Sequence, residues 1–209
     1  MIMESYDNPA LRAVINSAGL VTPDGMPVVW YMRRNGSPDQ KRVCGPDLMP
    51  ELLRKAERLG WRVGLHGGHP ETLEKLQERL RSDYPALNVV YANSPPFRAL
   101  TETEEIEIRN RINAAGVELL FVSLGCPKQE MWMSANKAHL SCVSIGVGAA
   151  FSFLAGTVKQ APVAMQRTGF EWLFRLVSEP KRLWHRYAKT NPRFMALVFF
   201  PFLRRQITD

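Results

Sequence analysis

Apolar residues along this chain recur at two different spacings, and segments with helical spacing alternate with short apolar runs. Residues 47–59 place four leucines and Ala56 at helical spacing and are followed by a glycine, which predicts a helix with a left-handed cap. Residues 71–82 repeat this pattern with three leucines on one stripe. Residues 101–115 begin with Thr101 and have Glu104 three positions later, which is the sequence of a capping box.

The apolar runs between these helices predict strands. The runs cover residues 62–66, 88–91, 118–124 and 141–147, and the last two are apolar enough to be buried on both faces, with a helix between them. Strands that alternate with helices of this length form parallel βαβ units. We therefore expect an α/β fold with an open, mostly parallel, Rossmann-like sheet and helices on both faces. Ligands bind such sheets at the carboxyl ends of the strands.

Two shorter segments precede this pattern. Residues 10–18 predict a helix opened by an Asn-Pro cap. Asp24 follows the apolar segment Leu20–Thr22, which we interpret as a short strand, and precedes Gly25. Two roles for Asp24 are open at this point. It can cap a helix that runs through residues 28–30, or it can lie at the carboxyl end of the strand and act as a general base.

The C-terminal quarter carries the net charge of the chain. Residues 159–209 contain ten Lys and Arg against three acids, which equals the net charge of +7 for all 209 residues, so residues 1–158 are neutral. Nine aromatic residues are interleaved with these cations. We expect a Rossmann-like domain over residues 1–158 and a helical appendage over residues 159–209 that associates with an anionic membrane surface.

Within this appendage, residues 172–177 have the helical spacing that also suits packing into a core, so both interpretations stay open for that helix. The longest apolar run, residues 195–203, is half the length needed to cross a bilayer and contains Pro201. It can lie on a membrane but cannot span it.

The cysteines and the N-terminus argue for a reducing compartment. Cys44, Cys126 and Cys142 are widely spaced and form no CxxC pair, so neither a disulfide set nor a zinc site is expected. Residues 1–9 lack the basic start and the apolar run of a secretory signal. We expect a cytoplasmic protein that is peripheral on the membrane and that uses no metal and no cofactor.

The loop after residues 62–66 contains two adjacent glycines between two histidines. Gly67 and Gly68 would let backbone amides approach a phosphate at the start of the next helix, although any tight turn between a strand and a helix also uses glycine. His66 and His69 have no third metal ligand nearby in the sequence. We interpret both as solvated loop residues.

Two later loops carry further candidates for substrate binding. Lys128 could neutralise a phosphate and Gln129 could hydrogen-bond a sugar or a base, while Glu130 could bind substrate or merely complement the dipole of its helix. Gly146 and Gly148 let a backbone or a ligand come close. The segment is not a complete GxGxxG fingerprint, and no phosphate-binding loop of the Walker type occurs.

These segments, in this order, resemble the bacterial glycosyltransferase family that includes the N-acetylmannosaminyltransferases of teichoic acid and enterobacterial common antigen synthesis. The resemblance extends from about residue 8 to about residue 192. Its marks are residues 23–26, 42–48, 125–130, 146–151, 153–156, 161–162, 165–167, 169–173, 175–176, 179–180, 182–183 and 186–187.

The resemblance implies inverting transfer of N-acetylmannosamine or another hexose from a UDP-sugar to a polyprenyl-diphosphate-linked saccharide, without a metal. It implies that Asp24 is the general base and that Arg42 and Gln129 belong to the active-site pocket. The chain contains no Asp-x-Asp pair of the kind that metal-dependent transferases use. Arginines of the appendage then stabilise the departing diphosphate. The arginines available for this role are Arg167, Arg175, Arg182 and Arg186.

Two departures from the family pattern leave alternatives open. Ser152 stands where the family commonly has an acid, and a strand with a threonine-and-asparagine loop that would precede residue 6 is absent. Either the reading frame is truncated, which we favour, or part of the acceptor pocket is missing and the protein binds a UDP-sugar without turnover. The pI of about 9.6 also suits a nucleic-acid binder. The neutral first 158 residues argue against that class, so we expect no nucleic-acid partner, while self-association stays open.

Overall fold

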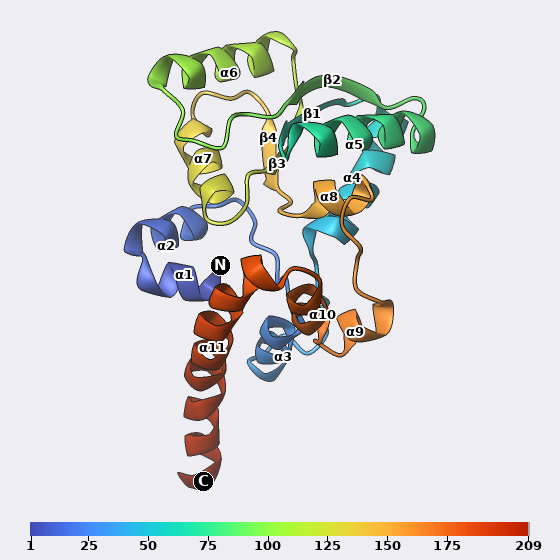
Figure 1. Cartoon of the computed structure of the whole chain (residues 1–209). Coiled ribbons are helices and arrows are strands. Elements are labelled where there is room, and N and C mark those ends of the chain that lie inside the picture. Colours follow the sequence, from blue (N-terminus) through green and yellow to red (C-terminus); the bar gives the residue numbers. More distant parts are fainter. Residues whose placement is uncertain (209) are drawn as a thin grey trace. The chain divides into compact units, whose positions relative to one another are not determined.

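The computed structural model describes the backbone of residues 1–208, together with their side chains except those of 182, 186 and 198–208. The chain divides into two compact units (Figure 1). Unit 1 comprises Met1–Ala13, Leu20–Val43 and Gln160–Asp209. Unit 2 comprises Val14–Gly19 and Cys44–Lys159.

Unit 2 is built on a four-stranded sheet with the order β2-β1-β3-β4, and all of its pairings are parallel. The strands are β1 (Arg62–Gly67), β2 (Asn88–Asn93), β3 (Leu119–Ser123) and β4 (Val143–Gly146). The helices are α4 (Gly45–Leu59), α5 (Pro70–Asp83), α6 (Glu102–Ala114), α7 (Lys128–Asn136) and α8 (Ala150–Leu154). The predicted α/β fold with a parallel sheet is confirmed.

Helices cover both faces of this sheet (Figure 1). On one face, α4, α5 and α8 pack on Val63, Leu65 and Phe121. On the other face, α6 and α7 pack on Leu120 and Val122. Because side chains alternate between the two faces of a strand, β3 contributes to both cores and is almost completely buried.

Local sequence signals set the helix ends as predicted. Thr101 and Glu104 form both hydrogen bonds of the capping box at the start of α6. Helix α4 ends at Gly60, whose φ of 68° is left-handed. The Asn8 side-chain oxygen accepts hydrogen bonds from the amides of Ala10 and Leu11, which caps the start of the next helix.

One strand prediction was wrong in part, and a second was wrong. The run that contains β4 was expected to be buried on both faces, but β4 is the last strand of the sheet and Val143 is 64% exposed. The segment Leu20–Thr22 forms no strand. Leu20 and Val21 are too short an apolar run to fill a core position, and they are 82% and 48% exposed.

Unit 1 contains helices from both ends of the chain. They are α1 (Ile2–Asp7), the first part of α2 (Pro9–Asn16), α3 (Met26–Arg34), α9 (Val163–Arg167), α10 (Glu171–Ser178) and α11 (Pro180–Thr208). The carboxylate of Asp7 at the end of α1 accepts two hydrogen bonds, of 2.6 and 2.8 Å, from the guanidinium of Arg193 in α11. This pairing lowers the pKa of Asp7 and raises that of Arg193. No helix within the described part of the chain is long and apolar enough to cross a bilayer.

Candidate functional site

Several predicted binding residues of unit 2 meet where β3 and β4 end. Gln129, in the first turn of α7, is buried, and its side-chain oxygen accepts a hydrogen bond of 3.2 Å from the Gly148 amide. Its side-chain nitrogen donates to Oε1 of Glu130 at 2.8 Å. A methyl group at Gly146 would lie 2.9 Å from that nitrogen, so a larger residue there would displace the Gln129 side chain. The Ser123 hydroxyl donates to the Gly148 carbonyl at 2.6 Å and completes the network.

This network gives its members different roles. Both polar atoms of the Gln129 side chain form hydrogen bonds within the protein. Gln129 therefore connects the loop after β4 to the start of α7. The second carboxylate oxygen of Glu130, Oε2, is buried and accepts no hydrogen bond from the described residues. Lys128 is exposed at the first position of α7. Glu130 and Lys128 therefore remain the candidates for direct contact with an anionic or hydroxyl-bearing ligand.

Gly67 and Gly68 have structural roles in the turn after β1. A Cβ at Gly67 would lie 2.4 Å from the Ser123 carbonyl oxygen, and its φ is 114°. The Gly68 amide donates to that same carbonyl at 2.9 Å, and the Gly68 carbonyl accepts from the Ser94 hydroxyl at 2.6 Å. The close approach of β1 to β3 accounts for Gly67, and the left-handed φ of 75° accounts for Gly68. The phosphate-binding role of both glycines stays a prediction.

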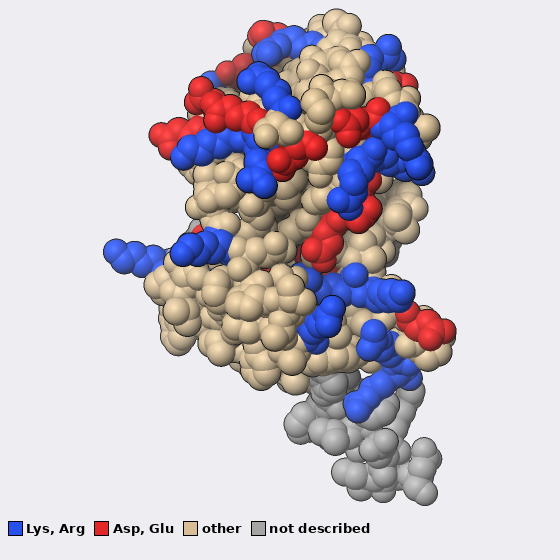
Figure 2. Space-filling view, turned by 90° about the vertical axis from the view of Figure 1, so that its right-hand side faces the viewer, with Lys and Arg blue, Asp and Glu red and all other residues tan. Residues whose placement is uncertain are grey.

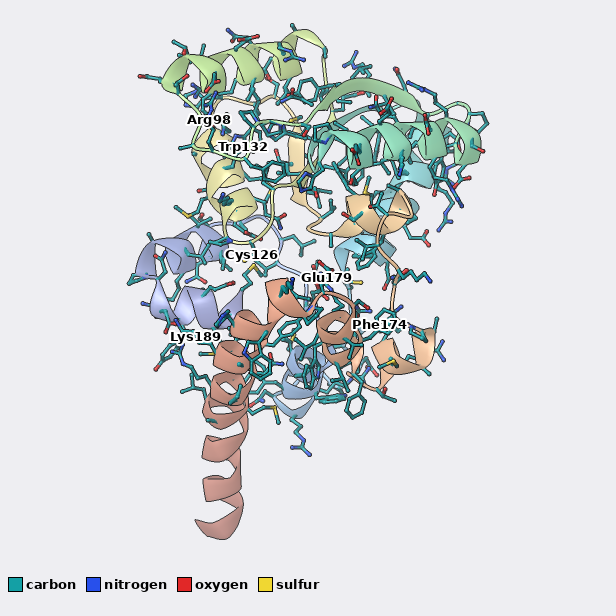
Figure 3. The ribbon with its side chains drawn as sticks, viewed as in Figure 1. Arg98, Cys126, Trp132, Phe174, Glu179 and Lys189 are labelled. Atoms are coloured by element: carbon teal, nitrogen blue, oxygen red, sulfur yellow. The ribbon has the colours of Figure 1, made fainter. Side chains whose placement is uncertain are left out.

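The interpretation of His66 as a solvated loop residue was wrong. His66 lies on β1 with no exposed surface, and its ring stacks on Trp132 of α7 with centroids 4.5 Å apart (Trp132 is labelled in Figure 3). Nδ1 lies 3.4 Å from the Tyr91 hydroxyl oxygen, while Nε2 is buried without a partner among the described residues. Burial lowers the pKa of His66 to about 4. His69 is exposed, as expected, and stacks on Phe97.

Asp24 belongs to unit 1 and stands neither on a strand nor at a helix cap. The residue at the N-cap of α3 is Gly25, and no side chain donates or accepts a capping hydrogen bond there. The segment is held instead by the Val43 amide, which donates to the Pro23 carbonyl at 3.0 Å. The predicted position of Asp24 at the carboxyl end of a strand was therefore wrong. Its side chain is 65% exposed.

Arg42 lies beside Asp24 and is held by two residues of the C-terminal segment. Its side chain is 13% exposed, and Nε lies 3.7 Å from Oδ1 of Asp24. Nη2 donates to Oε2 of Glu171 at 2.5 Å, and Nη1 donates to Oε1 of Gln166 at 3.2 Å. Gln166 is fixed in turn by a hydrogen bond of 2.8 Å to the Ala161 carbonyl. The structure thus brings together two predicted site residues, Asp24 and Arg42.

The other predicted arginines lie along the same segment of unit 1. Arg167 is exposed in the last turn of α9, and Arg175 is half-buried on α10. Arg182 and Arg186 belong to α11, but their side chains lie outside the described residues. Within the described part of the chain, no group of three or more His, Cys, Asp or Glu side chains is arranged to hold a metal ion.

Sequence reasoning did not assign roles to Glu171, Gln166 or Ser123. Glu171 and Gln166 lie more than a hundred positions from Arg42, and no local pattern connects them. Ser123 ends an apolar strand, and no motif around it indicates a binding role. Only the position of Glu171 and Gln166 within the family's motifs could have drawn attention to them.

Comparison with known proteins identifies the family to which the chain belongs. A curated relative from Bacillus spizizenii, "N-acetylglucosaminyldiphosphoundecaprenol N-acetyl-beta-D-mannosaminyltransferase", is 32% identical over 197 residues, which cover 93% of this chain and 74% of the relative. The family model described as "Glycosyl transferase WecG/TagA/CpsF family" matches residues 1–208. The chain therefore belongs to the WecG/TagA/CpsF family of glycosyl transferases.

Proposed function

We propose that this protein transfers N-acetylmannosamine, or a related hexose, from a UDP-sugar to a polyprenyl-diphosphate-linked saccharide in the synthesis of a cell-surface polysaccharide. The observation that carries the proposal is the family match over residues 1–208. The name of the relative supports the choice of sugar and of a lipid-linked acceptor. We place the protein on the cytoplasmic face of the cell membrane.

Asp24 is the general base of the proposed reaction. A base must reach the acceptor hydroxyl, and the Asp24 carboxylate is 65% exposed. Asp24 takes the hydroxyl proton as the acceptor oxygen forms its bond to the anomeric carbon of the donor. The bond between that carbon and the UDP oxygen breaks, and UDP leaves with the bonding electrons. Attack opposite the leaving group inverts the configuration of the sugar.

Cationic side chains stabilise the departing UDP in this mechanism, so the reaction needs no metal. The donor binds along the carboxyl ends of β1, β3 and β4, where Lys128 supplies a positive charge and Gly67, Gly68, Gly146 and Gly148 allow close approach. The buried Oε2 of Glu130 accepts a hydrogen bond from the donor, since no described residue uses it. Arginine binds diphosphate through two parallel hydrogen bonds. Arg167, Arg175, Arg182 and Arg186 take this role.

Helices α10 and α11 provide the contact with the membrane surface. Several large apolar side chains are exposed on and beside them, including Phe170, Trp172, Leu173, Val177 and Trp184. By contrast, the face of unit 2 that Figure 2 shows carries charges of both signs, which are interspersed over it. Aromatic and aliphatic side chains at a bilayer surface gain free energy by burial, and neighbouring cations add roughly 1 kcal/mol each near an anionic leaflet.

The test is product formation by the purified protein. Polyprenyl-diphosphate-N-acetylglucosamine is incubated with UDP-N-acetylmannosamine, with UDP-glucose and UDP-N-acetylglucosamine as competing donors, and the lipid product is identified by mass spectrometry. We expect addition of one sugar from one of these donors with stoichiometric release of UDP. Donor binding without product from any of them would contradict the proposal and favour a UDP-sugar-binding protein without turnover.

A further inference from the structure

Unit 1 holds both the net charge of the chain and most of its exposed apolar side chains. By sequence, unit 1 has fourteen Lys and Arg against seven Asp and Glu, which accounts for the whole net charge of +7, and unit 2 is neutral. Fifteen large apolar side chains are exposed in the described part of unit 1, against five in unit 2, although unit 1 is the smaller of the two. Exposed apolar side chains combined with excess positive charge are typical of a unit that binds an anionic bilayer.

Helix α3 contributes an exposed face to unit 1, although it lies outside the C-terminal appendage. Val29 of α3 is fully buried, whereas Trp30 and Tyr31 are 38% and 45% exposed. Arg33 and Arg34 are exposed in the last turn of the same helix. Positions 30, 31 and 34 share one side of a helix, so the aromatic pair and a cation stand on the same face. This is the composition of a helix that lies in a membrane surface.

Helix α3 lies beside the start of α10 within unit 1 (Figure 1). A Cβ at Gly169, two residues before α10, would lie 3.0 Å from the ring of Trp30, so this ring packs directly on the start of α10. Phe170, Leu173 and Val177 are all exposed. Their spacing of three and four residues places them on one side of α10. Trp30 of α3 is therefore a neighbour of the exposed apolar residues of α10.

We propose that Trp30 and Tyr31 of α3 insert into the surface of an anionic bilayer, next to the contact made by α10 and α11. The partner is a bilayer because the excess of cations in unit 1 complements anionic lipid headgroups. Membrane binding strengthens with the apolar area buried and with the attraction to anionic lipids, so α3 and the C-terminal helices act together. The inference rests on the proposed function, because it extends the membrane contact that this function assigns to α10 and α11.

Insertion of α3 brings the proposed base near the lipid-linked acceptor. Asp24 stands two residues before Met26, the first residue of α3. Trp30 lies four residues further along this helix, which is a rise of about 6 Å. When Trp30 enters the bilayer surface, Asp24 lies within reach of a saccharide whose diphosphate is at that surface.

The binding test is sedimentation of the full chain with vesicles made of equal amounts of phosphatidylglycerol and phosphatidylcholine. Tyr31→Glu places a negative charge on the proposed bilayer face, and we expect it to lower the partition coefficient about tenfold or more. Tyr31→Phe keeps an apolar ring and should bind within about twofold of the wild type. Ile106→Glu is the matched control, because Ile106 is 43% exposed on α6 of unit 2, and it should leave binding unchanged. Binding of Tyr31→Glu as tight as that of the wild type would overturn the inference.

Quenching of tryptophan fluorescence tests the insertion of Trp30 with a conservative variant. Trp30→Phe keeps an aromatic ring and removes one fluorophore, so the difference between its emission and that of the wild type is the emission of Trp30. Vesicles with the same headgroups but brominated acyl chains should quench this difference, because bromine quenches fluorophores that reach the acyl chains. A difference that the brominated vesicles leave unchanged would overturn the inference. Melting temperatures are measured for all variants, and if Tyr31→Glu does not fold, the quenching of Trp30 decides.

The same variants distinguish a bilayer from a second copy of the chain as the partner of this face. If Tyr31→Glu leaves vesicle binding unchanged and converts a dimer into a monomer in analytical ultracentrifugation, a second copy covers the face and the inference is overturned. Vesicle binding needs neither donor nor acceptor, so it is measured independently of sugar transfer. A wild-type protein that transfers no sugar, but whose vesicle binding is lost in Tyr31→Glu, would overturn the proposed function and leave this inference intact.

Discussion

Replacement of His66 by phenylalanine should make the stability of the protein less sensitive to acid. Burial on β1 lowers the pKa of His66 from 6.5 to about 4. Between these two pH values the unfolded chain binds a proton at His66 that the folded protein does not bind. The contribution of His66 to stability is present above pH 6.5 and is lost as the pH falls toward about 4. The unfolding free energy lost through His66 is about 3.4 kcal/mol at a pH below both pKa values, and about 2 kcal/mol at pH 5. The phenylalanine ring keeps the stack on Trp132 but cannot titrate.

The assay is urea unfolding of the wild type and of His66→Phe at pH 7 and pH 5, followed by tryptophan fluorescence. If the unfolding free energy falls by about 2 kcal/mol per molar urea, the 2 kcal/mol difference corresponds to about 1 M urea. Between pH 7 and pH 5 the unfolding midpoint of the wild type should therefore fall by about 1 M more than that of the variant. Other groups that titrate in this range are shared by both proteins and cancel in the comparison. His139→Phe is the matched control at an exposed histidine, and it should behave as the wild type. Equal acid sensitivity in the wild type and His66→Phe would refute the reasoning.

Three further predictions concern the site and its surroundings. Transfer activity should survive EDTA, and loss of activity that manganese or magnesium restores would contradict the proposed role of the arginines. Deletion of residues 195–209, which spares the pairing of Arg193 with Asp7, should release the protein from anionic liposomes in a sedimentation assay, whereas unchanged sedimentation would show that the run 195–203 is not the anchor. Gly67→Ala should destabilise the fold more than Gly60→Ala, because only the first places a methyl group against a carbonyl oxygen; equal unfolding midpoints would contradict this.

The helices and strands of unit 2 could be predicted because each is specified locally. The apolar period of α4 and α5 and the capping box of α6 act over a few residues, and the structure has all three elements. The position of β4 at the end of the sheet could not be predicted in this way. Strand order depends on which neighbour each strand finds in the fold, and an apolar run does not encode it.

The site was less predictable because its contacts are made at long range. His66 looks like a loop residue beside two glycines, yet β1 is buried on both faces and its last residues take their environment from Trp132 and Tyr91. The motifs that contain Asp24 and Arg42 identified both residues, but the hydrogen-bond partners of Arg42 come from α9 and α10. Contacts of this kind are set by the packing of distant helices and not by spacing along the chain.

The role of Asp24 is tested most directly by one pair of measurements on Asp24→Asn. The rate of sugar transfer is measured at saturating donor and acceptor, and the affinity for the UDP-sugar is measured by calorimetry on the same preparation. Loss of the base should lower kcat by roughly 10² or more while the Kd for the donor stays within about twofold of wild type. Near-normal turnover by Asp24→Asn would contradict the assignment of Asp24 as the base of the transfer.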